Sequence, residues 1–338
     1  MYDKILGIDI AKSTFDVALL PLQAPAAGHT ERVRTRHFSN TPDGFADLQR
    51  WLATEQVAGV FACFEATSTY GEALAAALHA AGHTVVRANP YQIKRYAQSE
   101  LQRSSTDRLM AAVIARFARE RQARLPAWTP PDPALAILQD LVRHADDMET
   151  LCGQVKNRLE RPGHCAAVID SLTETARQLE AELQRIRQQI RAWVAEHPTL
   201  AAQTALLDTI TGFAETSAVA VLSEVGDVTR YASTRQAACY AGVIPCSVQS
   251  GTSVSSEAHF SPHGNRRLRK ALFYPALVAI RRDPRINAFY QRLRKAGKTK
   301  MSAVGAVMHK LLRIAVAILR SGRGYDLYIP PQEVLTTQ

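Results

Sequence analysis

The chain has 338 residues, enough for two or three domains that each bury a core. A hydrophobic content of 46% with 21% charged residues is that of a folded protein and excludes a disordered chain. The formal net charge of +10 favours an anionic partner.

Signal, membrane and metal-cluster patterns are not found. The start, MYDKILGID, lacks the basic-then-apolar pattern of a signal peptide. The most apolar stretch, 303–319, is interrupted by His309, Lys310 and Arg313, so no membrane span is expected. The five cysteines are scattered without a CxxC pair, which indicates neither a disulfide framework nor a zinc cluster. We expect a cytoplasmic protein.

The first 125 residues alternate between strand and helix patterns. Strands are predicted at 2–11, 15–22, 31–38, 57–66 and 83–89, and helices at 42–53, 70–81 and 104–121. The order βββαβαβα, a meander followed by crossovers, is that of a ribonuclease-H-like domain. We therefore predict an α/β domain over residues 1–125.

A proline-rich break and a pair of long helices occupy residues 126–200. The segment LPAWTPPDPA (125–134) predicts a stiff linker. Helical patterns over 134–160 and 166–196, separated by RPGH, predict a helical hairpin. Small or apolar residues form a nearly heptad stripe at 172, 176, 179, 183, 186, 190 and 194. We favour a dimer seam or a spacer over an intramolecular core for this stripe.

The last part, residues 201–338, is predicted to be mainly helical and is strongly basic. After His197-Pro198 ends the preceding helix, 206–227 predicts two helices around a glycine turn, and 245–262 is a Ser-rich loop. Helices follow over 264–323, where residues 266–323 hold 16 Lys and Arg and a single acid, Asp283. Such an imbalance favours a polyanion partner over a merely solvated face.

Three acids occupy positions that this fold would bring together. Asp9 lies inside the hydrophobic first strand, Glu65 ends the fourth, and Asp107 opens the last helix of the domain. In a ribonuclease-H-like sheet the first and fourth strands are neighbours, and the last helix packs across their ends. Converging carboxylates repel one another unless they hold a hard cation such as Mg²⁺ or Mn²⁺. Taken singly, Glu65 could cap a turn and Asp107 could be an ordinary helix N-terminal charge.

At these acids the chain resembles a known family. The resemblance covers nearly the whole length and is carried by GIDIAKSTFDV (7–17), FEATSTYG (64–71), STDRLMAAVIA (105–115), QVKNRLE (154–160), SEVGDVTRYASTRQAACYAGVIP (223–245), QSG (249–251) and SPHGNRRLRKALF (261–273). In these phrases it is similar to the DEDD-type insertion-sequence transposases and recombinases of the insertion-sequence-110 group, which includes the Piv-type DNA invertases.

The resemblance implies a domain plan and an active site. It implies a RuvC-like domain over 1–125, a coiled-coil hairpin over 126–200 and a transposase domain over 201–338. It also implies metal-dependent DNA cutting and rejoining in which Asp9, Glu65 and Asp107 hold Mg²⁺ or Mn²⁺.

This chain departs from the family motif at one acid position. The motif also predicts which serine is the nucleophile. The family expects a fourth acid where this chain has Met110, and a thioether is a poor ligand for Mg²⁺. Three acids could suffice, Asp16 or a water could substitute, or activity could be impaired or removed. Asp16 lies in the next predicted strand, and we favour a structural role for it. By motif, Ser250 before Gly251 matches the family's nucleophilic serine, which would form a covalent phosphoserine link to DNA.

The basic helices predict phosphate contacts, which fix position without reading bases. We predict such contacts for Arg266, Arg267, Arg269, Lys270, Arg281, Arg282, Lys298 and Lys300. The resemblance implies that a structured guide (bridge) RNA reads the DNA sequence instead. It further implies a dimer or tetramer working on nucleoid DNA, with no membrane partner.

Two other functions fit the same residues. A metal-dependent nuclease or junction resolvase would use water and the three acids without Ser250. A catalytically impaired relative would bind nucleic acid without cleaving it, which the residue at position 110 favours slightly.

Overall fold

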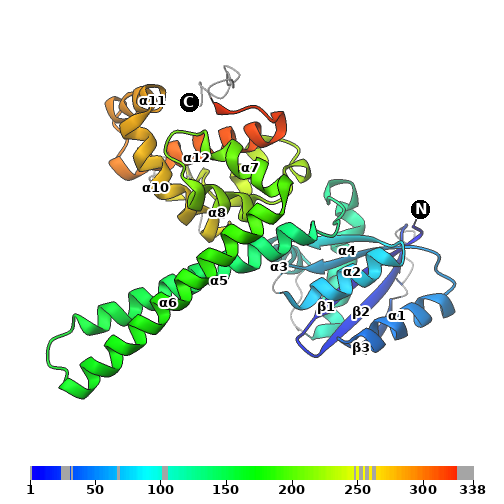
Figure 1. Ribbon diagram of the computed structural model, residues 1–338. Helices are drawn as coiled ribbons and strands as arrows, with labels where there is room; N and C mark the ends of the chain where they lie inside the picture. Colours follow the sequence, from blue (N-terminus) through cyan, green and yellow to red (C-terminus); the bar gives the residue numbers. More distant parts are fainter. Residues whose placement is uncertain are drawn as a thin grey trace. The chain divides into compact units, whose positions relative to one another are not determined.

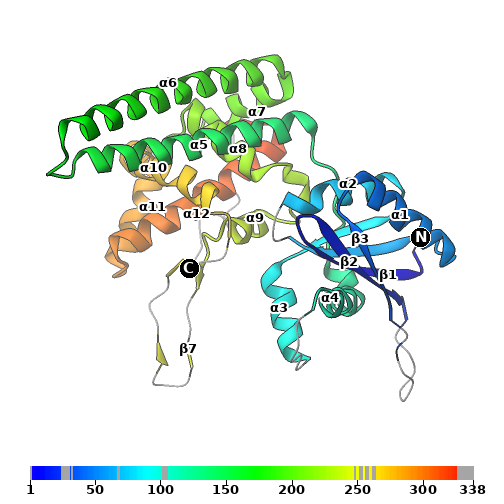
Figure 2. The same ribbon diagram turned by 90° about the horizontal axis from the view of Figure 1, so that it is seen from below.

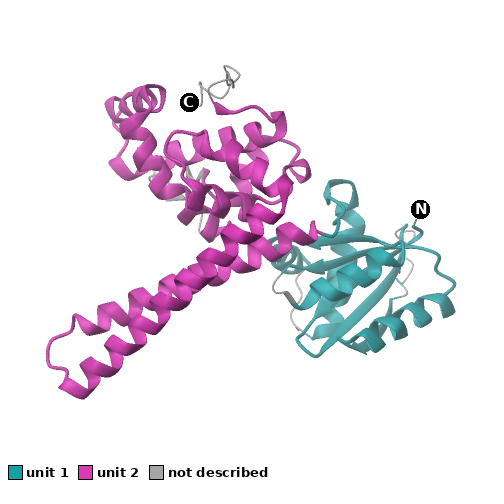
Figure 3. Cartoon of the chain, in the orientation of Figure 1, with its two compact units in different colours: residues 1–130 teal, residues 131–338 magenta. Residues whose placement is uncertain are grey.

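A computed structural model gives the fold and describes residues 2–23, 31, 33–66, 69–100, 106–246, 249–250, 254–255, 259–260 and 264–325. The chain divides into two compact units, residues 1–130 and 131–338 (Figure 3). A sheet with covering helices forms the first unit, and the second is mainly helical (Figure 1). The predicted class, an α/β part followed by a helical part, is confirmed.

The sheet of the first unit has five strands in the order β3-β2-β1-β4-β5. The strands are β1 (Lys4–Ile10), β2 (Thr14–Pro21), β3 (Arg34–Ser39), β4 (Val60–Glu65) and β5 (Thr84–Ala88). β1, β2 and β3 form an antiparallel meander, whereas β4 runs parallel to β1 and β5 parallel to β4. The central strand is therefore β1, the strand that carries Asp9.

Helices cover both faces of this sheet. α1 (Pro42–Thr54) and α2 (Glu72–Ala80) pack on the face that presents Leu6 and Ile8 of β1. α3 (Pro90–Ser99) and α4 (Asp107–Arg121) pack on the opposite face with Ile5. α3 was not predicted; it begins at Pro90 after the cap residue Asn89, whose side chain accepts from the Tyr91 backbone N–H. Two short 3-10 turns, Thr69–Gly71 and Gln122–Arg124, complete the unit.

Gly7 allows α4 to approach β1 closely. A Cβ atom at this position would lie 2.2 Å from the backbone oxygen of Ala111 and 2.3 Å from the backbone nitrogen of Ala115. Backbone atoms cannot move aside like the end of a flexible side chain, so β1 and α4 touch only because residue 7 has no side chain. This contact brings the end of β1 near the start of α4.

We expect Gly7→Ala to lower the free energy of unfolding of the first unit by about 3 kcal/mol, because the added methyl group overpacks the strand–helix contact. Urea denaturation followed by tryptophan fluorescence measures the change. Gly153→Ala in α5 is the matched control: nothing lies within 4 Å of its added methyl group, so a gain of up to about 1 kcal/mol is expected. An unchanged Gly7→Ala protein would contradict this packing.

The second unit begins with a long antiparallel helical hairpin, α5 (Pro133–Leu159) and α6 (Ala166–Glu196), which lie side by side (Figure 2). The heptad stripe of α6 is buried within the chain at Ala176, Leu183, Ile186, Ile190 and Val194. The prediction of a dimer seam is therefore wrong for these positions. The stripe is buried because α5 supplies a matching apolar face and the last three residues join the core of the whole unit.

The remaining helices pack around this core. They are α7 (Pro198–Asp208), α8 (Glu215–Val225), α9 (Thr234–Ala241), α10 (Arg266–Arg282), α11 (Pro284–Lys295) and α12 (Lys300–Ser321), with a 3-10 turn at Val228–Arg230. Between α9 and α10 the short strand β6 (Pro245–Cys246) pairs with β9 (His259–Phe260), and β7 (Gln249–Ser250) pairs with β8 (Val254–Ser255). The sequence did not predict α9.

The turn between α7 and α8 packs closely against α10. Gly212, in the turn between α7 and α8, has φ +102°, and a Cβ there would lie 2.4 Å from the backbone oxygen of Pro275 in α10. The α7–α8 turn thus packs against α10.

In the described part of the chain α12 is long and apolar enough to cross a membrane, but 72% of its apolar window is buried inside the unit, as in a core helix.

Candidate active site

The sheet's alternation places Asp9 on the α4 side. Side chains of a strand alternate between faces, so Asp9 shares the face of Ile5 and Gly7. Glu65 lies on the same face of β4, two residues after Cys63, which belongs to the core under α4. The strands run parallel, with Ile8 paired to Phe64, so Asp9, next to the last residue of β1, and Glu65, the last residue of β4, lie at the same end of neighbouring strands.

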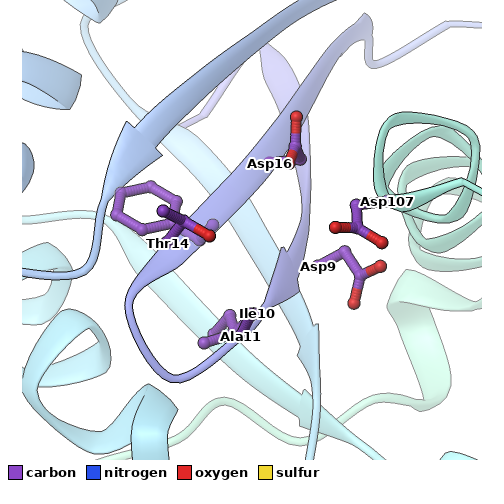
Figure 4. A pocket seen from close by; sticks show the side chains of 7 residues that line it. Asp9, Ile10, Ala11, Thr14, Asp16 and Asp107 are labelled. Carbon is purple, nitrogen blue, oxygen red and sulfur yellow. The ribbon is translucent and has the colours of Figure 1, made fainter.

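Asp107 is brought to this edge as the first residue of α4. The hydroxyl of Thr106 caps the helix by accepting from the backbone N–H of Leu109, and the carboxylate of Asp107 lies in the first turn, where the helix dipole favours negative charge. Asp9 and Asp107 line one pocket of about 120 Å³. Figure 4 shows their carboxylates facing one another. The structure thus brings together the acids predicted from the first strand and the last helix of the domain.

Burial and the neighbouring acids shift the pKa of Asp9. Burial, followed by the negative charges of Asp107, Glu65 and Asp16, raises the pKa of Asp9 to about 6. Burial also raises the pKa of Glu65. The site therefore concentrates negative charge that a nearby cation would offset.

The carboxylate oxygens of Asp9 and Asp107 are chemically suited to bind a divalent cation. Carboxylate oxygens are hard ligands of the kind that Mg²⁺ prefers, and Mg²⁺ usually keeps several waters or phosphate oxygens besides one or two carboxylates. Within the described ranges, no three His, Cys, Asp or Glu side chains are arranged so that they alone could hold a metal ion. The Asp9–Asp107 pair therefore offers part of a coordination shell that water and phosphate oxygens would complete.

Asn40 connects the strand ends that carry the acids, although no sequence motif points to it. Its side-chain Nδ2 donates to the backbone oxygen of Ala11 at 3.1 Å and to that of Tyr70 at 3.0 Å. The first oxygen belongs to the β1–β2 turn and the second to the segment after β4. Asn40 thus links the end of the strand with Asp9 to the chain that follows Glu65.

Comparison with known proteins decides the family. The model of the DEDD transposases of IS110 elements, described as "Transposase", matches residues 6–162, and that of the "Transposase IS116/IS110/IS902 family" matches residues 204–291. The pilin gene-inverting proteins of Moraxella bovis and Moraxella lacunata are each 30% identical to the chain over 324 residues, 95% of this chain and 97% of each relative. The chain belongs to the IS110 family of transposases. A further relative, the 43.6 kDa protein of insertion element IS110 from Streptomyces coelicolor, is 26% identical over 219 residues, 65% of this chain and 51% of that protein.

The IS110-family transposase is a DNA transposase or recombinase, so DNA is its substrate. Transposases of the DEDD type generally use a divalent metal. Asp9, Glu65 and Asp107 all fall inside the first matched segment, and Ser250 falls inside the second. Their individual roles stay predictions.

For Ser250, the candidate nucleophile of the transposase, the structure describes only the backbone. Ser250 lies in β7, where it pairs with Val254 of β8. Its side chain and the following Gly251 lie outside the described residues. The assignment of Ser250 as nucleophile therefore rests on the sequence motif.

Three of the basic residues predicted to contact nucleic acid are engaged within the transposase itself. Nη2 of Arg267 donates to Asp147 at 2.9 Å, and Nζ of Lys270 donates to Glu149 at 3.1 Å and also to Asp146. Nη1 of Arg269 donates to the backbone oxygen of Ala241. These contacts tie α10 to α5 and to the end of α9, so part of the charge run serves the fold.

Five other predicted contacts are exposed. They are Arg266, Arg281, Arg282, Lys298 and Lys300. No carboxylate in the described part of the transposase forms an ion pair with them. Their charge is available to phosphates, and their role as nucleic-acid contacts stays a prediction.

We expect the double variant Arg281→Gln/Arg282→Gln to bind duplex DNA about tenfold more weakly. The slope of log K against log salt should fall by up to about 1.8, because each lost phosphate contact removes about 0.9. Fluorescence anisotropy across a KCl series measures both quantities. The matched control, Arg267→Gln/Lys270→Gln, removes equal charge from the same helix, but from residues already paired with α5 carboxylates. Equal slopes for the two double variants would contradict this distinction.

Proposed function

We propose that this transposase cuts and rejoins DNA through a covalent intermediate in which Ser250 is joined to a 5′ phosphate. The observation that carries the proposal is the convergence of Asp9 and Asp107 in one pocket, with the charge of Glu65 acting on Asp9. The strand order β3-β2-β1-β4-β5 supports a RuvC-like, ribonuclease-H-like assignment for the first unit. The two Moraxella relatives are named for gene inversion, a reaction that also needs strand cutting and rejoining.

Asp9, Glu65 and Asp107 would hold Mg²⁺ or Mn²⁺ beside the scissile phosphate. The metal supplies Lewis-acid stabilisation of negative charge on phosphate oxygens. The carboxylates would fix the position of the cation to which the phosphate binds, and the exposed arginines and lysines of α10 to α12 would hold the flanking backbone.

The proposed covalent step balances without an external reagent. The Ser250 oxygen forms a bond to phosphorus as the bond between phosphorus and the 3′ oxygen breaks, and the serine proton passes to the leaving 3′ oxygen, which becomes a hydroxyl. Attack by another 3′ hydroxyl on the phosphoserine reverses the process and joins a new strand pair. No high-energy cofactor is needed, because one phosphodiester replaces another.

The proposal includes the partners that the resemblance implies. A structured guide RNA would select the DNA sites, and a dimer or tetramer would bring two DNA segments together on the nucleoid. The exposed basic residues suit the backbones of both nucleic acids, since phosphate contacts carry no sequence information themselves.

The test is to incubate the full-length protein with DNA carrying the element ends, the RNA that copurifies with it, and Mg²⁺. A denaturing gel should show DNA covalently attached to protein only when Mg²⁺ is present. Cleaved DNA without the adduct would indicate a water-using nuclease or resolvase. Binding without cleavage would indicate a catalytically impaired relative.

A further inference from the structure

A third carboxylate, Asp16, lines the same pocket as Asp9 and Asp107. It lies directly opposite Asp9 in the antiparallel β1–β2 pair. Directly opposed residues point to the same face of a sheet, so Asp16 shares the α4 side with Asp9. Figure 4 shows Asp16 on the strand next to that of Asp9.

The burial of Asp16 is unusual for a carboxylate. Only 4% of the residue is exposed, although two other carboxylates line the same pocket. Burying a negative charge near like charges costs free energy unless a positive charge compensates. The fold therefore holds Asp16 in a place that favours a cation.

The partners of Asp16 only partly compensate this cost. Nδ1 of His37, its cross-strand neighbour in β3, donates to Oδ2 of Asp16 at 2.8 Å. The His37 side chain is 49% exposed, so this pair is half solvated and contributes little stability. Oδ1 lies 3.6 Å from Nε of Arg108, too far for a hydrogen bond, and the Arg108 side chain is 68% exposed. One oxygen of Asp16 is thus oriented by His37 while the other remains able to accept a further ligand.

The side chain at position 110 lies against the apolar core and not in the pocket that Asp9, Asp16 and Asp107 line. Met110 packs against the apolar core between the sheet and α4. It does not line the pocket. The side chain that follows Asp107 by one helical turn therefore adds no oxygen to the site.

We propose that Asp16, oriented by His37, is a further carboxylate of the divalent-cation site proposed for Asp9, Glu65 and Asp107, so that water and phosphate oxygens still complete the coordination shell. This inference rests on the proposed function, since it assigns a further ligand or positioning group to the metal that function requires. It is a statement about cation affinity and can be tested without nucleic acid.

The test is Mn²⁺ binding to the full-length protein by isothermal titration calorimetry. Wild type should bind Mn²⁺, and Asp9→Asn should remove that binding. Asp16→Asn keeps an oxygen that can accept from His37 but loses the negative charge. Its Kd should rise by about ten- to hundredfold, with no loss in thermal unfolding temperature. Asp47→Asn is the matched control, because Asp47 lies on α1, which packs on the opposite face of the sheet, and its side chain is 51% exposed.

A second variant separates a role in cation binding from a structural one. Asp16→Glu keeps a carboxylate at this position and should retain more of the Mn²⁺ affinity than Asp16→Asn does, even where its longer side chain lowers the unfolding temperature. If Asp16 were purely structural, Mn²⁺ affinity would not follow the charge at position 16.

The outcomes separate the two proposals. If Asp16→Asn binds Mn²⁺ as wild type does while Asp9→Asn does not, the role of Asp16 is refuted and the proposed function stands. If wild type shows no Asp9-dependent binding, the metal site and the role of Asp16 are both refuted.

Discussion

Asp9→Asn is expected to reduce Mg²⁺-dependent DNA cleavage by roughly a thousandfold or more. A catalytic metal contributes several kcal/mol of charge stabilisation, and each 1.36 kcal/mol corresponds to a factor of about ten in rate. Asn preserves the shape of the side chain at the centre of the acid cluster but removes its charge. Single-turnover cleavage of labelled element-end DNA measures the effect, with Asp47→Asn as the control variant. Cleavage at the wild-type rate would refute the assigned role of Asp9.

The same substitution should stabilise the metal-free fold near neutral pH. In the folded protein the pKa of Asp9 is raised from the ordinary 3.8 to about 6, so its charged form is disfavoured by folding. That destabilisation is fully present above pH 6 and declines to nothing as the pH falls towards 3.8. Without Mg²⁺, Asp9→Asn should therefore unfold at a higher temperature than wild type at pH 7, and the difference should disappear near pH 4. A variant that unfolds earlier at pH 7 would contradict the electrostatic account.

Ser250→Ala is expected to abolish the covalent protein–DNA adduct while leaving DNA binding unchanged. Alanine lacks the hydroxyl oxygen that would form the bond to phosphorus at residue 250, so the loss should be complete within detection. Denaturing gels measure the adduct and anisotropy measures DNA binding.

Ser255→Ala in β8 is the matched control for this variant, because it removes a hydroxyl from the strand paired with β7. Adducts that persist in Ser250→Ala would refute the assigned nucleophile. Strand cleavage that continues without adducts would instead favour hydrolysis by water.

The helical hairpin shows where local pattern and tertiary packing diverge. The apolar period of α6 predicts a helix with one buried face, and that helix is present from Ala166 to Glu196. A single sequence does not tell whether the face meets another copy or another part of the same chain. The partner proved to be α5, with ion pairs between Arg187 and Glu149 and between Lys156 and Glu180 across the hairpin.

The basic residues of α10 show that sequence alone does not reveal which charges are paired inside the fold. The sequence predicts the excess of Lys and Arg on α10 but cannot tell which of them already have partners. Lys270 and Arg267 meet carboxylates more than a hundred residues earlier in the chain, whereas Arg281 and Arg282 remain exposed. α3 and α9 were not predicted because each is short, at ten and eight residues, and its periodic signal spans few turns.

The sequence by itself determined the five strands of the sheet, the long helices and the family resemblance, because alternation, caps and motif spacing are local properties. It also predicted the acids Asp9, Glu65 and Asp107 as one site. Only the tertiary structure decided that Gly7 lets α4 reach the sheet, that Asp16 joins the pocket and that Met110 does not. These outcomes depend on which face each side chain occupies and on what lies opposite it. Residues distant in the chain share a face only once strand register and helix packing are set.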